Sequence, residues 1–317
     1  MKTPRPGPPS QGGREKLAVI GTGVIGSGWA ARALARGLQV SAWDPAPGAE
    51  ARLRAAIENA WPALKRVGLA KGASRRKLVF TKDLASAVRD ADFVQESSPE
   101  DERLKRAVLA EIDGVALPHV VVASSSSGLL PSRLQLRCGH PERVLIGHPF
   151  NPVYLLPLVE VIAGKQTSAS AIKRANAFYR SLGMRPLHVQ QEIAGYISDR
   201  LQEALWREAL HLVADGIATT QEIDDAIIYG PGLRWAFMGT FLGFHLAGGD
   251  GGMEHMLEQF GPALKLPWTK LRAPDLTSEL AQRVVNGAKS QANGRSVKEL
   301  ERWRDDQLIR IMAVTGA

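Results

Sequence analysis

Residues 16–44, KLAVIGTGVIGSGWAARALARGLQVSAWD, decide the fold. The apolar run 17–20 stops at a glycine and is typical of a short buried strand. Residues 24–36 indicate a helix that closes on a second glycine, and 38–43 form another apolar run. Strand, helix and strand in this order predict a βαβ unit with two parallel strands.

The same alternation continues along the chain. Further strands are predicted near 78–81, 92–95, 119–124, 143–147, 158–162 and 185–189, and further helices near 48–66, 100–112 and 168–182. Such alternation implies an α/β fold with a doubly wound, mostly parallel Rossmann-type sheet. After about residue 190 the strand signals stop and helical spacing takes over, beginning with the capping-box pattern Thr219-x-x-Glu222.

We therefore predict three parts. They are a flexible arm over 1–15, a sheet domain over 16–190 and an all-helical domain over 191–317. The arm is rich in Pro and Gly and lacks the apolar core of a signal peptide. No apolar run reaches the ~20 residues that a membrane span needs, so we expect no membrane partner.

The composition narrows the class of protein. With 44% hydrophobic and 23% charged residues, the 317-residue chain is neither disordered nor fibrous. One cysteine, Cys138, excludes an intrachain disulfide and a thiolate metal cluster, so we expect no metal and a reducing compartment, the cytoplasm.

The formal charge of +8 admits a nucleic acid or an anionic ligand as partner. Because its basic stretches carry no interleaved aromatics, we expect an ordinary charged surface and no nucleic acid.

The turn Gly21-Thr22-Gly23-Val24-Ile25-Gly26 is a candidate cofactor site between the first strand and the first helix. Its glycines permit a tight turn, close approach of a pyrophosphate and close helix–strand packing, and the helix N-terminus attracts the anion. Asp44, at the end of the second strand, would bind the adenosine ribose hydroxyls. A 2′-phosphate would face this carboxylate, so NAD is favoured over NADP.

A histidine and a glutamate form the candidate catalytic pair. His148 begins HPFNP at the end of a predicted strand, and Glu160 lies within the apolar run PLVEVI over 157–162. Burying that carboxylate is costly unless it is paired, and a histidine is a natural partner. The pair could take a proton from a hydroxyl group, with the carboxylate fixing the histidine tautomer. From the spacing alone, a histidine that only satisfies a core hydrogen bond fits equally well.

Four serines, Ser124 to Ser127, follow the apolar strand residues 120–122. Side chains at the carboxyl end of a strand lie on the rim where doubly wound sheets bind ligands. A polar turn or a helix cap is the alternative.

Together these residues resemble the 3-hydroxyacyl-CoA dehydrogenase superfamily, particularly its branch with lambda-crystallin and gulonate dehydrogenase. The resemblance covers about residues 16–317, and its signatures are GTGVIG at 21–26, SGL at 127–129, HPFNP at 148–152 and PLVEV at 157–161. Longer strings resemble the members of that branch that oxidise L-carnitine. They are WDPAPGAEA at 43–51, HPFNPVYLLPLVEV at 148–161, SLGMRPLHV at 181–189, EALWREALHLV at 203–213 and GPALKLPWTK at 261–270.

The resemblance implies roles for particular residues. His148 would be the general base, Glu160 its partner and Ser127 the group that orients the substrate oxygen. Glu100 and Lys105, in the helix after the fourth strand, would lie near the nicotinamide and its ribose. The helical domain would form a homodimer and close the active-site cleft.

The chain departs from the family in one substrate-contacting motif. The family has Gly-aromatic-Ile-x-Asn-Arg, whereas this chain has Gly195-Tyr-Ile-Ser-Asp199-Arg200. A carboxylate at Asp199 would favour the trimethylammonium group of carnitine, and an ion pair with Arg200 is the alternative. Because a quaternary ammonium donates no conventional hydrogen bond, we also expect an aromatic wall. The candidates are Phe150, Tyr154, Tyr196, Trp235, Phe237 and Phe241, and we expect Asn151 among the substrate-binding residues.

The expected function is NAD-dependent oxidation of the 3-hydroxyl of L-carnitine. One alternative is the same chemistry on gulonate, 3-hydroxybutyrate or a 3-hydroxyacyl thioester. Another is a crystallin-like protein that binds NAD without turnover.

Overall fold

The computed structural model describes residues 15–262, 266–269, 275 and 277–315. The chain divides into two compact units, with the division between Asp199 and Arg200. The arm predicted over 1–15 lies outside the described residues except for Glu15. In the described part of the chain, no helix is both long and apolar enough to cross a membrane.

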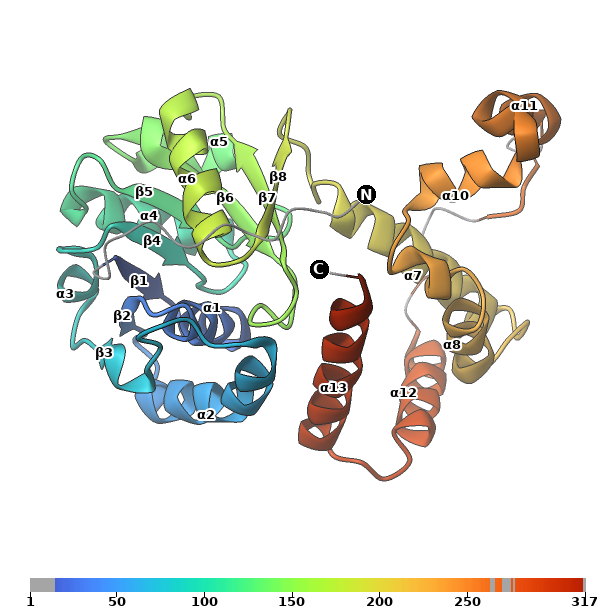
Figure 1. Ribbon diagram of the computed structural model, residues 1–317, viewed down its shortest axis with the longest axis horizontal. Helices are drawn as coiled ribbons and strands as arrows, with labels where there is room; N and C mark the ends of the chain where they lie inside the picture. Colours follow the sequence, from blue (N-terminus) through green and yellow to red (C-terminus); the bar gives the residue numbers. More distant parts are fainter. Residues whose placement is uncertain (1–14, 263–265, 270–274, 276, 316–317) are drawn as a thin grey trace. The chain divides into compact units, whose positions relative to one another are not determined.

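The first unit contains a single sheet, which has eight strands in its described residues (Figure 1). The strands are β1 (Lys16–Ile20), β2 (Gln39–Trp43), β3 (Leu78–Phe80), β4 (Phe93–Glu96), β5 (Val121–Ser124), β6 (Val144–Pro149), β7 (Leu158–Ala163) and β8 (Arg185–Val189). Their order across the sheet is β3-β2-β1-β4-β5-β6-β7-β8. Neighbouring strands are parallel except β6 and β7, which are antiparallel. The predicted mostly parallel, doubly wound sheet is confirmed.

Helices cover both faces of this sheet. They are α1 (Val24–Ala35), α2 (Ala49–Val67), α3 (Leu84–Val88), α4 (Glu102–Val115), α5 (Pro131–Leu134) and α6 (Ala169–Ser181), with 3-10 turns η1 (Arg75–Lys77), η2 (Gln135–Arg137) and η3 (Pro141–Arg143). Side chains of α1, α2 and α6 join one buried apolar cluster, and those of α3, α4 and α5 join another. In β1, Leu17 and Val19 belong to the first cluster, whereas Ala18 and Ile20 belong to the second. Burial on both faces explains why this strand is apolar throughout.

The topology creates a binding crevice where the strand order changes direction. From β1, the chain first adds β2 and β3 on one side and then places β4 on the other side. In open α/β sheets, ligands bind at the carboxyl ends of the strands at such a switch point. Gly21 leaves β1 there with φ +87°, and a Cβ on it would lie 2.6 Å from the backbone of Ser97, which follows β4. Glycine is therefore required at this close approach.

The second unit is helical in its described residues, as predicted. Its elements are the greater part of α7 (Ser198–Ala214), then α8 (Thr220–Ile228), α9 (Gly232–Trp235), α10 (Thr240–Ala247), η4 (Gly249–Gly251), α11 (Gly252–Phe260), α12 (Ser278–Ala292) and α13 (Val297–Thr315). The predicted capping box at the start of α8 is confirmed. The Glu222 N–H donates to Thr219 Oγ1 at 3.2 Å, and the Thr219 N–H donates to Glu222 Oε2 at 2.8 Å.

Candidate active site

The glycine turn leaves open space in front of a helix N-terminus. At Gly26 a Cβ would collide with the carbonyl oxygen of Gly21, so this glycine permits the turn to pack on α1. At Gly23 a Cβ would meet no described atom within 4 Å. Helix α1, described over its whole length, begins without a side-chain cap and without an acid in its first turn. An open N-terminus with no competing acid fits a pyrophosphate.

Asp44 connects the glycine turn to the loop after β2. Its Oδ2 accepts the Thr22 N–H at 2.7 Å and the Thr22 hydroxyl at 3.2 Å, and its Oδ1 accepts the Ala46 N–H at 2.9 Å. It also lines a cavity of about 540 Å³ together with Phe80 and Lys82. A carboxylate at the mouth of a cavity beside this turn fits the hydroxyls of an adenosine ribose. Lys82 brings a cation to the same cavity.

A buried ion cluster lies behind the carboxyl ends of β4 and β5. Lys105 Nζ lies 3.1 Å from Glu96 Oε1 and 3.5 Å from Glu100 Oε2. Glu96 is completely buried, and its Oε2 accepts the Ser124 hydroxyl at 2.5 Å. Glu100 Oε1 accepts the backbone N–H of Ser127 at 3.0 Å. Lys105 and its two carboxylate partners therefore hold the serine loop in place.

Glu100 lies just before α4, which corrects the prediction that it belongs to the helix. The reason is local: Asp101 is the N-cap of α4, and its side chain accepts the Leu104 N–H at 2.7 Å. Outside the helix, the Glu100 carboxylate meets the serine loop from the side.

The four serines divide into three anchors and one exposed group. Ser124 and Ser126 donate to Glu96 and Glu100, each at 2.5 Å. Ser125 Oγ accepts the Trp29 Nε1–H at 3.1 Å. Ser127 is exposed, so its hydroxyl can meet a ligand.

His148 and Glu160 face each other across the antiparallel pair β6 and β7. The strand register sets them opposite, and His148 Nδ1 lies 3.0 Å from Glu160 Oε2. The other carboxylate oxygen, Oε1, accepts the backbone N–H groups of Ile197 at 3.1 Å and Ser198 at 3.0 Å. Burial by itself would raise the pKa of Glu160, but these hydrogen bonds and the charge of His148 hold that pKa below its ordinary value of 4.5. Glu160 is therefore ionised at neutral pH.

Aromatic rings enclose the imidazole of His148. The ring centroid of Phe150 lies 4.9 Å away and that of Tyr196 lies 5.4 Å away. Tyr196 is fully buried and its hydroxyl donates to the Leu129 carbonyl at 2.8 Å. It follows Gly195, and the backbones of both residues are left-handed, with φ +45° at Tyr196 and +71° at Gly195. A left-handed tyrosine is strained, and this turn leads directly to the two N–H groups that bind Glu160.

The acid that departs from the family pattern lies against the same histidine. Asp199 Oδ2 is 3.7 Å from His148 Nε2, and the Asp199 side chain is 27% exposed. The imidazole therefore lies between two carboxylates, one buried at Nδ1 and one partly open at Nε2. A cationic group entering beside Nε2 would meet a negative charge.

The structure places two other predicted site residues in different settings. Asn151 is exposed in the loop after β6, and Trp235 belongs to the second unit, on α9. Two features of the site were not predicted from the sequence: the buried Glu96, and the N–H groups of Ile197 and Ser198 that bind Glu160. A signal for Glu96 was present, because this acid directly follows the predicted strand near 92–95, and a carboxylate buried there needs a partner.

Comparison with known proteins identifies relatives of both units. Residues 16–193 match the 3-hydroxyacyl-CoA dehydrogenase NAD binding domain, and residues 195–295 match the C-terminal domain of the same family. A protein named L-carnitine dehydrogenase from a Pseudomonas species is 60% identical over 95% of this chain and 94% of its own length. Another of the same name, from Bacillus cereus, is 61% identical over 94% of this chain and 91% of its own length.

A similar solved structure is that of 5-formyl-3-hydroxy-2-methylpyridine 4-carboxylic acid 5-dehydrogenase, described as an NAD+-dependent dismutase. It is 29% identical, covers 96% of this chain and 99% of its own chain, and has a TM-score of 0.81.

The hydrogen bonds of Glu160 predict a pH-dependent stability difference. Because its pKa lies below 4.5 in the folded chain, its contribution is complete above about pH 4.5 and is lost as the pH falls through the folded pKa. We expect Glu160→Gln to lower the free energy of unfolding by about 1–3 kcal/mol at neutral pH. Urea unfolding should show this difference shrinking below about pH 4.5. A difference that stays constant or grows in acid would contradict the assignment.

Proposed function

The chain belongs to the 3-hydroxyacyl-CoA dehydrogenase family, and we propose that it oxidises the 3-hydroxyl of L-carnitine to a 3-keto group, using NAD. The observation that carries the proposal is the His148–Glu160 pair with the Asp199 carboxylate beside its open nitrogen. The pair supplies a base for the hydroxyl, and Asp199 supplies an anion for the ammonium group. The names of the relatives support the same substrate.

The glycine turn and the residues after β2 and β4 would hold the cofactor. Backbone N–H groups at Gly21–Gly26 would bind the pyrophosphate, and Asp44 would bind the adenosine ribose. Glu100 and Lys105 would lie near the nicotinamide end. When bound, NAD supplies the acceptor for the hydride that leaves carbon 3 of the substrate.

The charge state of Glu160 assigns the nitrogens of His148. An ionised carboxylate only accepts hydrogen bonds, so the Nδ1–H of His148 donates to Glu160. In the neutral imidazole, the lone pair is then on Nε2, the nitrogen beside Asp199. His148 takes the hydroxyl proton there as the carbon–hydrogen bond breaks, and Glu160 stabilises the resulting imidazolium. The exposed Ser127 hydroxyl orients the substrate oxygen.

Asp199 and the aromatic rings would select the trimethylammonium group. The gross attraction between two unit charges at close range is about 4 kcal/mol near a protein surface, before desolvation is subtracted. Phe150 is half-buried beside His148 and can present its ring to the cation, whereas Tyr196 is fully buried and shapes the pocket from behind. Asn151, exposed in the loop after β6, is a further candidate for the substrate pocket.

We also propose a homodimer formed through the helical unit, in the cytoplasm. Large apolar side chains are exposed on the described part of this unit, among them Tyr229, Leu233, Phe237 and Phe241. A second copy would remove such a surface from water.

The single cysteine, Cys138, fits a reducing compartment. Burial raises the pKa of its thiol to about 12, so the thiol stays protonated and unreactive at neutral pH.

His148→Ala should lower kcat with L-carnitine by about 100-fold or more, because it removes the base. NAD affinity, measured by calorimetry, should change less than about twofold. His140→Ala is the matched control, since His140 is exposed and pairs with Glu142 at the surface. Near-normal turnover of His148→Ala would rule out the proposed base.

Asp199→Asn should raise the KM for L-carnitine by about tenfold, which corresponds to about 1.4 kcal/mol of lost attraction. The KM for 3-hydroxybutyrate, which has no ammonium group, should remain unchanged or fall. Steady-state kinetics of the wild type and of Asp199→Asn measures both KM values, and 3-hydroxybutyrate serves as the control substrate. Equal effects on the two substrates would show that Asp199 does not recognise the cation.

A further inference from the structure

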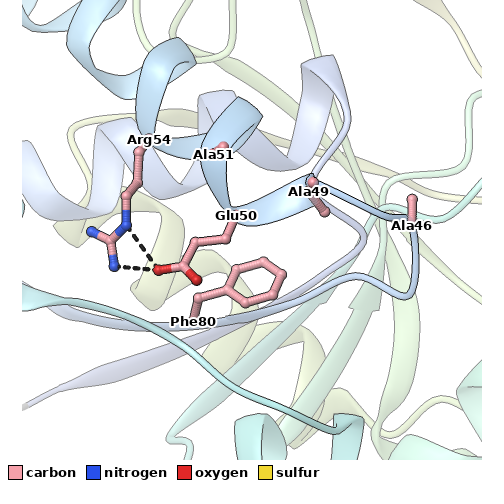
Figure 2. Close-up of a pocket in the computed structure, with 7 residues that line it drawn as sticks. Ala46, Ala49, Glu50, Ala51, Arg54 and Phe80 are labelled. Atoms are coloured by element: carbon pink, nitrogen blue, oxygen red, sulfur yellow. Dashed lines mark hydrogen bonds and ion pairs between the residues drawn. The ribbon is translucent and has the colours of Figure 1, made fainter.

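An ion pair on helix α2 lies beside the proposed ribose site. Glu50, in the first turn of α2, accepts two hydrogen bonds from Arg54 through the same oxygen, at 2.9 Å from Nε and 2.7 Å from Nη2. Figure 2 shows this pair next to the ring of Phe80. Both side chains are 49% exposed, so the pair is open to solvent and to a ligand.

Two cavities meet at Glu50 and Phe80. The first, of about 540 Å³, is also lined by Asp44, the acid proposed to bind the adenosine ribose. The second, of about 490 Å³, is also lined by Arg54 and by Gly48 at the start of α2. Glu50 therefore lies between the ribose-binding acid and a guanidinium group that already has a partner.

The distinction between NAD and NADP is a single phosphate on the 2′-oxygen of this ribose. An acid after the second strand favours the free hydroxyls, and a nearby arginine accommodates the 2′-phosphate. A guanidinium group can bind two phosphate oxygens at once. This chain has both groups, in two cavities that share Glu50 and Phe80, so Asp44 alone does not account for a preference for NAD.

We propose that Glu50 determines the choice of NAD over NADP by occupying Arg54. With Glu50 in place, the Nε–H and one Nη2–H of Arg54 are bound to a carboxylate, and Glu50 adds a second negative charge to the cavity that Asp44 lines. Without Glu50, Arg54 becomes a free cation in the second cavity, where it binds the 2′-phosphate. Glu50 is thus a specificity residue for the cofactor, distinct from the residues that act on the substrate.

Other cations nearby are held differently. Arg52 donates to the Pro47 carbonyl at 2.7 Å and is not among the residues that line either cavity. Lys82 lines the first cavity beside Asp44 and is absent from the lining of the second. Arg54 is therefore the cation whose availability changes when Glu50 loses its charge.

The test is a double-mutant cycle read out by binding. The dissociation constants of NADP and NAD are measured by calorimetry without substrate for the wild type, Glu50→Gln, Arg54→Ala and the double variant. We expect Glu50→Gln to tighten NADP binding by about fivefold or more, with NAD binding changed by less than about twofold. The double variant should lose this gain, and Arg54→Ala alone should bind NADP like the wild type.

Glu58→Gln is the matched control for charge. Glu58 lies on the same helix, pairs with Arg75 and lines neither cavity. If Glu50→Gln binds NADP no more tightly than Glu58→Gln, or if the double variant keeps the gain, the proposal is wrong. The readout needs no L-carnitine, so failure of the proposed substrate leaves it interpretable.

Discussion

The hydrogen bond between His148 and Glu160 connects strand β6 to strand β7, and Glu160 also binds the start of α7. The position of the catalytic site depends on these contacts. The antiparallel register of β6 and β7 places the two side chains opposite each other. The second oxygen of Glu160 binds the N–H groups of Ile197 and Ser198, so the same carboxylate also holds the start of α7. Asp199 is the next residue, and it lies beside Nε2 of His148. One buried carboxylate thus positions both the base and the group proposed to bind the cation.

The cofactor side of the site depends on a second buried charge cluster. Glu96 and Lys105 neutralise each other without access to water, and Glu100 extends this cluster to the backbone of the serine loop. Removing one partner would leave an uncompensated buried charge, so the cluster is costly to disrupt. Glu96 and Ser124 lie at the ends of strands, and Lys105 lies on α4. These elements hold the serine loop, so the exposed Ser127 hydroxyl has a fixed position.

The sequence predicted the sheet well because strands such as β1 and β7 are mainly apolar and are bounded by turn signals. It did not predict that β7 runs antiparallel to β6, because an apolar run carries no information about the direction of the strand. Glu100 was placed in the helix because nothing local distinguishes it from Asp101, which caps α4. The pairing of Glu96 was missed because its partner Lys105 is nine residues further along the chain, on α4, and no local pattern connects the two. A tyrosine gives no sign in the sequence that its backbone will be left-handed, as that of Tyr196 is. The turn that brings the N–H groups of Ile197 and Ser198 to Glu160 therefore could not be predicted.

The His148–Glu160 pair and the adjacent Asp199 are proposed to act together in the oxidation of a hydroxy acid that carries an ammonium group. The most direct measurement is NADH formation by the purified wild-type protein with L-carnitine, compared with D-carnitine, 3-hydroxybutyrate, L-gulonate and a 3-hydroxyacyl-CoA. We predict that kcat/KM for L-carnitine exceeds each of the others by at least about tenfold. A higher kcat/KM for a substrate without the ammonium group would contradict the proposed roles of His148 and Asp199.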